Sequence, residues 1–152
     1  MSGFGGFVGA SGPPVRRDVV EAMAGALALR GPDATGVWAG DGCALVHTLF
    51  RTTDESAAER QPISLDDRFF LAGDARLDSR DDLIADLVRV GRPVSSSWPD
   101  ADLVLHAWLV WRDDCVQHLR GDFSFVIWDR IGRRLFGARD HFGVRPFYYA
   151  PV

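Results

Sequence analysis

The first thirty residues contain a short apolar stretch followed by an amphipathic one. Residues 3–9 are apolar and rich in glycine, which predicts a buried strand with close backbone approach. Val19 and Met23 recur at helical spacing in a run that predicts a helix over about residues 18–29, with Asp18 as its N-cap. The chain is therefore expected to open with a strand and a helix.

Apolar runs with alternation predict further strands, separated by turns or by helices. They are expected at 36–39, 43–50, 68–74, 123–128 and 135–138. Residues 40–42 form a hairpin turn signal between the first two. A second helix is expected to begin at Ser79, with Asp82 completing a capping box, and to end at Gly91. A third helix is expected to begin at Asp100.

The order of these elements indicates the fold class. Consecutive strands joined by short turns are typical of antiparallel sheets, because parallel strands need long crossover connections. The helices are segregated from the strands instead of alternating with them. This arrangement predicts an α+β fold. At 152 residues, the chain is expected to form one domain over residues 1–152.

Composition narrows the function classes. Hydrophobic residues make up 47% of the chain and charged residues 25%, which argues against a disordered tail and a membrane protein. All 17 basic residues are arginine, so a Schiff-base lysine, a lysine general base and a phosphate-loop lysine are excluded. The net charge of −4 argues against a nucleic-acid partner. Without a signal-peptide pattern or a long apolar run, we expect a cytoplasmic protein with no membrane partner.

The cysteines and histidines show no metal-binding pattern. Cys43 and Cys115 lie far apart without CxxC or CxxH spacing. They could form one disulfide, but we expect two buried free thiols in a reducing compartment. The four histidines have no i,i+4 pair, so no metal site is expected.

Several sequence blocks in a fixed order carry a family resemblance. They are SGFGGFVG at 2–9, RGPD at 30–33, GDARLD at 73–78, RGDFSF at 120–125 and ARDHFGVRPFYY at 138–149. With these blocks the chain resembles the N-terminal glutaminase domain of the asparagine synthetase family, a class II glutamine amidotransferase. The resemblance implies an N-terminal-nucleophile fold, a four-layer αββα sandwich in which two antiparallel sheets lie between helix layers.

The resemblance also implies a chemistry for the N-terminus. Removal of Met1 would give Ser2 both a side-chain nucleophile and an α-amine, whose ordinary pKa of about 7.7–8.0 lets it accept a proton at neutral pH. The nucleophile attacks the side-chain amide of glutamine, and ammonia passes to an ATP-dependent synthetase or cyclase domain in cis or in trans. ATP and Mg²⁺ belong to that partner, so no cofactor is expected on this chain. A homo-oligomer is compatible with the resemblance.

Two positions of the reaction centre depart from the family pattern. Where the family has a cysteine nucleophile, this chain has Ser2, which is either a weaker nucleophile or simply a small residue at a crowded strand tip. Where the family has an Asn-Gly pair that stabilises the oxyanion, this chain has Ala72 and Gly73. The Gly73 backbone amide is then the remaining candidate donor. Loss of one such donor typically lowers the rate by about 10²–10³.

The substrate-binding positions also differ. The arginine that binds the α-carboxylate of glutamine aligns with Leu49. Arg51, two residues further on the same strand face, is a candidate substitute or else a solvated arginine. Asp100 aligns with the acid that binds the α-ammonium of glutamine, and it is equally suited to cap the third helix.

These residues lead to two main hypotheses. In the first, the chain is a degenerate amidotransferase domain that supports an asparagine-synthetase-like or peptide-cyclase-like partner. In the second, it is an active glutamine amidohydrolase that uses Ser2 to supply ammonia for amide synthesis. A sandwich unrelated to amide chemistry is the least favoured reading. Three weakened elements that act on the same transition state favour the first hypothesis.

Overall fold

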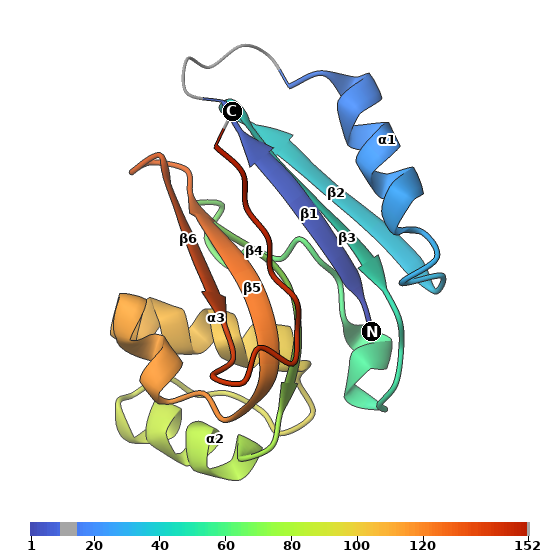
Figure 1. Ribbon diagram of the computed structural model, residues 1–152. Helices are drawn as coiled ribbons and strands as arrows, with labels where there is room; N and C mark the ends of the chain where they lie inside the picture. Colours follow the sequence, from blue (N-terminus) through green and yellow to red (C-terminus); the bar gives the residue numbers. More distant parts are fainter. Residues whose placement is uncertain (10–14, 152) are drawn as a thin grey trace.

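The computed structural model describes residues 1–9 and 15–151. Its elements, in chain order, are β1 (Gly3–Val8), α1 (Arg17–Leu27), β2 (Ala34–Gly40), β3 (Cys43–Leu49), the 3₁₀ helix η1 (Glu55–Ala58), β4 (Phe69–Leu77), α2 (Arg80–Arg89), α3 (Asp100–Trp111), the 3₁₀ helix η2 (Arg112–Gln117), β5 (Gly121–Asp129) and β6 (Arg134–Arg139). The strands form two antiparallel sheets, ordered β1-β3-β2 and β4-β5-β6 (Figure 1).

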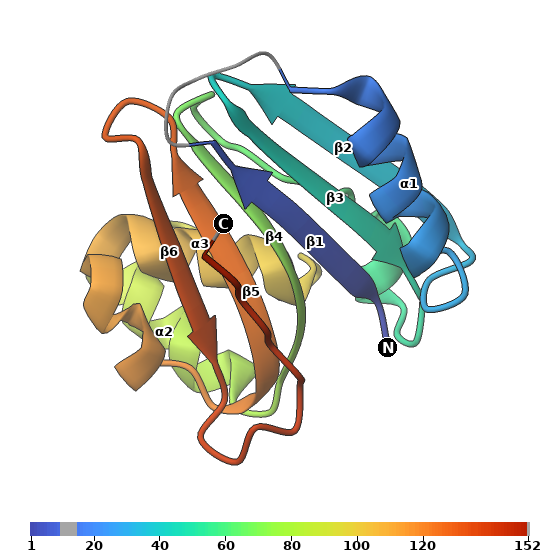
Figure 2. The ribbon, with the colours of Figure 1, turned by 45° about the horizontal axis from the view of Figure 1, so that its top comes forward.

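The two sheets lie between helix layers. Helix α1 covers the outer face of the first sheet, and α2 and α3 cover the outer face of the second (Figures 1 and 2). One cluster of buried side chains fills the space between the sheets. A second cluster lies between the first sheet and α1, and a third lies between the second sheet and helices α2 and α3. The predicted four-layer α+β sandwich is therefore confirmed.

Strand β3 shows how the sequence pattern follows from these layers. It is the central strand of its sheet, and all seven of its residues are buried. Ala44 and Val46 face α1, whereas Cys43 and Leu45 face the second sheet. Because both faces of the strand are covered, it is a nearly continuous apolar run.

Local chemistry decides the tight connections. The predicted hairpin between β2 and β3 forms, with Asp41 at φ 53° and Gly42 at φ 78°. Positive φ at both central residues is the type I′ geometry that suits the twist of antiparallel strands. The glycines of β1 do mark close approach, since a Cβ on Gly6 would lie 2.6 Å from the carbonyl oxygen of Ala44.

The helices begin within a residue of their predicted starts, but the predicted side-chain capping contacts do not form. Arg16, not Asp18, is the N-cap of α1, and Asp18 lies in the first turn, paired with Arg16. Ser79 is the N-cap of α2 but makes no side-chain cap bond, so it forms no capping box with Asp82. Pro99, not Asp100, is the N-cap of α3, and the carboxylate of Asp100 instead accepts a hydrogen bond from Leu77 outside the helix.

Both cysteines are buried and free, as predicted. Cys43 lies between the sheets, and Cys115 lies under the helix layer of the second sheet. Among the helices of residues 1–9 and 15–151, we find none long and apolar enough to cross a membrane.

Candidate active site

A pocket of about 190 Å³ opens where the start of β1, the loop after β3, the middle of β4 and the start of α3 meet. We call it the Ser2 pocket. Its ionisable lining residues are Glu55, Glu59, Asp74, Arg76, Arg80, Asp100 and Arg145. The structure therefore brings Ser2 and Asp100, two of the predicted site residues, into one cavity.

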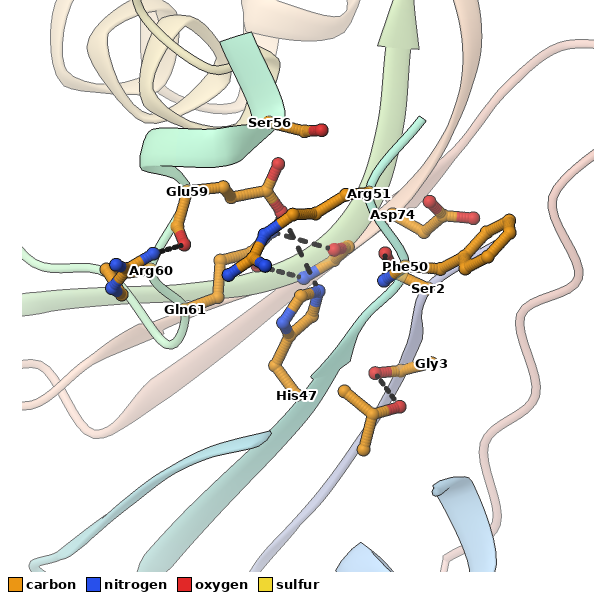
Figure 3. A network of polar contacts seen from close by, with 12 residues as sticks. Ser2, Gly3, His47, Phe50, Arg51, Ser56, Glu59, Arg60, Gln61 and Asp74 are labelled. Atoms are coloured by element: carbon orange, nitrogen blue, oxygen red, sulfur yellow. Dashed lines mark hydrogen bonds and ion pairs between the residues drawn. The ribbon is translucent and has the colours of Figure 1, made fainter. Parts of the chain in front are cut away.

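Ser2 is held at the wall of this pocket by the pairing of β1 with β3. The register begins at Gly3 opposite Thr48, which leaves Ser2 beside the residues that follow β3. The Ser2 hydroxyl oxygen accepts a hydrogen bond of 3.0 Å from the Phe50 N–H (Figure 3). Ser2 is 6% exposed, whereas Met1, which also lines the pocket, is about half exposed. Removal of Met1 would therefore widen the pocket directly at Ser2.

The Gly73 amide is already hydrogen-bonded. Its N–H donates to Oε1 of Gln61 at 2.8 Å, and Nε2 of Gln61 donates to the Gly73 carbonyl at 3.0 Å. Ala72 is fully buried and has no polar side chain. In this arrangement neither residue of the Ala-Gly pair offers a free donor to an oxyanion.

The outer edge of β4 reveals a backbone donor that the sequence analysis missed. On this edge the Leu71 N–H donates to Ile63, and the Leu77 N–H donates to Oδ2 of Asp100, both at 2.9 Å. Because outward amides alternate along an antiparallel strand, the N–H of Ala75 lies on the same edge as those of Leu71 and Leu77. Ala75 lines the Ser2 pocket, so its amide is a candidate backbone donor there.

Asp100 is tied into an ion pair instead of capping α3. Its carboxylate accepts the Leu77 N–H and pairs with the Arg80 guanidinium. Arg80 also donates to the carbonyls of Ser96 and Trp98. This network fixes Asp100 at the pocket wall, where its expected role toward the α-ammonium of glutamine stays a prediction.

Arg51 is not among the residues that line the pocket. It is exposed, and its backbone N–H donates to the Asp33 carboxylate at 2.7 Å. Arg76, Arg80 and Arg145 line the pocket instead. Arg76 and Arg145 lie inside two of the motif blocks, but sequence spacing could not show that they reach the same cavity.

The sequence analysis also missed a group of polar side chains next to Gly73, formed by His47, Glu59 and Gln61. Burial raises the pKa of Glu59 to about 7, a hydrogen bond from Gln61 opposes this rise, and Asp74 and Asp102 add to it. Burial lowers the pKa of His47 to about 4. The His47 Nε2 and the Glu59 carboxylate are 3.8 Å apart, too far for a hydrogen bond. Glu59 lines the pocket and titrates near neutral pH, so it can exchange protons there.

Comparison with known proteins places these residues in a family. The family model described as "Glutamine amidotransferase domain" matches residues 1–152. The chain belongs to the glutamine amidotransferase domain family. The amidotransferase domain is 32% identical over 136 residues to the glutamine-hydrolysing asparagine synthetase 3 of Bacillus subtilis, a match that covers 88% of this chain and 22% of the relative.

Two further comparisons extend this result. The amidotransferase domain is 31% identical over 139 residues to amidase chry2 of Gibberella zeae, covering 88% of this chain and 20% of the relative. Among solved structures, it resembles the glutamine phosphoribosylpyrophosphate amidotransferase of B. subtilis in its complex with ADP and GMP. That likeness has a TM-score of 0.55 at 21% identity and covers 71% of this chain and 25% of the other, so it shows the shared fold.

Proposed function

We propose that this asparagine-synthetase-like amidotransferase domain is degenerate, has lost Ser2-dependent hydrolysis of glutamine, and serves as a docking domain for an ATP-dependent, amide-forming partner. The partner would be a synthetase or cyclase domain, in cis or in trans, that holds ATP and Mg²⁺ itself. The N-terminal pocket would then be a retained site with reduced chemistry.

The double hydrogen bond between Gln61 and Gly73 carries this proposal. An oxyanion donor must be free and aimed at the reacting carbonyl, and each lost donor typically lowers the rate by about 10²–10³. The Gly73 N–H is already used by Gln61, and Ala72 has no side-chain amide. A serine hydroxyl at position 2 adds a further loss, because it is much less acidic than a thiol.

Surface composition near the C-terminus supports the docking role. Phe142, Tyr148 and Tyr149 are almost fully exposed, and they follow the edge strand β6. Exposed aromatic side chains grouped in one segment are typical of an interaction surface. The chain spans about a fifth of the length of the two relatives, 22% and 20%. The remainder of such a protein has the size needed for a partner domain.

The test is glutamate release from glutamine by the purified chain, with the Ser2→Ala variant as the reference. An intact mass that lacks Met1 is required, so that a blocked N-terminus does not explain a negative result. We expect the wild-type chain to release no more glutamate than Ser2→Ala. Turnover that depends on Ser2 would overturn the proposal.

A second candidate is an active glutamine amidohydrolase that uses Ser2 to supply ammonia for the synthesis of asparagine or another amide. Two observations favour it: the Ser2 hydroxyl accepts a hydrogen bond from the Phe50 N–H beside the pocket, and Ala75, a candidate backbone donor, lines the same pocket. In this case the oxyanion would form beside Ala75 and not beside Gly73. The same glutamate assay separates the two candidates.

A further inference from the structure

A partly buried ion pair lies beside the N-terminus in the Ser2 pocket. Nη1 of Arg145 is 3.0 Å from Oδ2 of Asp74, and the two side chains are 13% and 14% exposed. Both residues line the pocket together with Ser2. Figure 3 shows the Asp74 carboxylate on the side of the site where Ser2 and Phe50 meet.

The segment after β6 holds Arg145 in this position. The carboxylate of Asp140, which is buried, accepts the backbone N–H groups of Val144 and Arg145 at 2.9 and 3.0 Å. Two residues beyond Arg145, Phe147 stacks on Phe4 of β1, with ring centroids 6.1 Å apart. The segment thus runs between the two sheets (Figure 1). Because contacts on both sides of Arg145 hold this segment, the guanidinium has a fixed place in the pocket.

The electrostatics of Asp74 show which groups face it. Burial raises the pKa of this carboxyl, whereas Arg145, the N-terminal ammonium, the backbone N–H of Ser2 and Arg30 lower it. The backbone N–H of Ser2 therefore lies near enough to the carboxylate to favour its charged form while the nitrogen is still an amide. Once Met1 is removed, that same nitrogen becomes the α-amine.

We propose that Asp74 and Arg145 form a charge pair that positions the α-amine of Ser2 and, after Met1 is removed, prevents Asp74 from raising the pKa of that amine above its ordinary value of about 7.7–8.0, so that a fraction of it is uncharged near neutral pH. A carboxylate alone beside the amine would favour the ammonium form, which cannot accept a proton. The Arg145 guanidinium offsets that charge while Asp74 still orients the amine. Both residues are positioning residues in this role, since they act through the α-amine.

The other charged groups of the pocket are expected to affect the charge of the Ser2 amine less than Asp74 and Arg145 do. Arg80 and Asp100 neutralise each other in their own ion pair. Burial raises the pKa of Glu59 to about 7, so its charge is partial at neutral pH. Glu55 and Arg76 also line the pocket and carry opposite charges. The inference concerns the charge of the amine and holds whether or not glutamine is hydrolysed.

The absence of lysine makes the test direct. After removal of Met1 the α-amine of Ser2 would be the single amine of this sequence, because every basic side chain is an arginine. Its extent of acylation by a trace of acetic anhydride can be followed by intact mass as a function of pH. The midpoint of that curve reports the pKa of the amine without any glutamine turnover.

We expect Arg145→Gln to raise this midpoint by about one pH unit or more, and Asp74→Asn to lower it. The double variant should return close to the wild-type midpoint. Arg68→Gln, which breaks the Arg68–Asp129 pair outside the pocket, is the matched control and should leave the midpoint unchanged. Circular dichroism checks that each variant is folded, and Asp74→Asn carries the test if Arg145→Gln does not fold.

Two results would overturn the inference. One is a midpoint that stays within about 0.2 pH units of wild type in folded Arg145→Gln and Asp74→Asn variants, where a neighbouring charge should act. The other is retention of Met1 on the purified chain. Neither result depends on the fate of glutamine, so the proposed function can stand or fall separately.

Discussion

Gln61 and Gly73 form a closed pair of hydrogen bonds, 2.8 and 3.0 Å long, between a side-chain amide and a strand backbone. Gln61 is buried, and its Nε2 also donates to Glu59 at 2.7 Å. The pair satisfies polar groups that the edge of β4 would otherwise leave open. Because the Gly73 N–H donates to Gln61 in this contact, it is not free to donate to an oxyanion in the pocket.

Replacing Gln61 tests the structural side of this contact. Gln61→Leu would leave the buried N–H and C=O of Gly73 without partners, and we expect a loss of about 3 kcal/mol in the free energy of unfolding. Urea unfolding followed by circular dichroism should show a lower midpoint and an unchanged slope. The matched control is Gln117→Leu, because the Gln117 amide is exposed. Equal midpoints for the two variants would contradict the prediction.

Restoring the family residues tests the chemical side. Ser2→Cys supplies a more acidic nucleophile, and Ala72→Asn adds a side-chain amide at the oxyanion position. We expect the double variant to release glutamate from glutamine at least about tenfold faster than Ser2→Cys alone. Ala72 is fully buried, so a melting curve must accompany the rate. A wild-type chain as fast as Ser2→Cys would argue for the active amidohydrolase.

The raised pKa of Glu59, about 7 against an ordinary 4.5, predicts a pH-dependent stability. Between these two values the folded state binds a proton that the unfolded state has lost, so wild-type stability falls as the pH rises. The Glu59→Gln variant lacks this carboxyl and therefore lacks its contribution to the pH dependence of stability. The unfolding free energy of the variant relative to wild type should therefore increase by about 3 kcal/mol from pH 4.5 to 7.

The control for this titration is an exposed glutamate. Glu21 pairs with Arg17 on the surface of α1, and both side chains are largely exposed. Denaturant titrations of Glu21→Gln should run parallel to wild type over the same pH range. The lowered pKa of His47 is common to wild type and Glu59→Gln, and it cancels in their difference. A constant difference between Glu59→Gln and wild type would refute the assignment.

Ligand binding distinguishes the two candidate arginines. Arg76 lines the pocket and has no ion-pair partner among residues 1–9 and 15–151, whereas Arg51 does not line the pocket. We expect Arg76→Gln to weaken binding of glutamine about tenfold through loss of a carboxylate contact, and Arg51→Gln to leave it unchanged. Isothermal titration calorimetry measures both. The reverse order would return Arg51 to the site.

Local elements followed well from the sequence. The hairpin at residues 40–42 is specified by its own turn residues, and the apolar run of β3 reflects burial on both faces. The helix caps were less predictable, since the carboxylate of Asp100 found a partner 23 residues away at Leu77. A side chain that could cap a helix does so only when no tertiary contact competes for it.

By itself, the sequence determined the order of strands and helices, the α+β class, the family motifs and the presence of Ser2 at the second position. Only the tertiary structure decided that Gln61 occupies the Gly73 amide and that Arg145 meets Asp74. The physical reason is that strand and helix periodicity are local properties of the backbone. The choice of partner among 21 acids and 17 arginines depends on which sheet edges and loops come together in space.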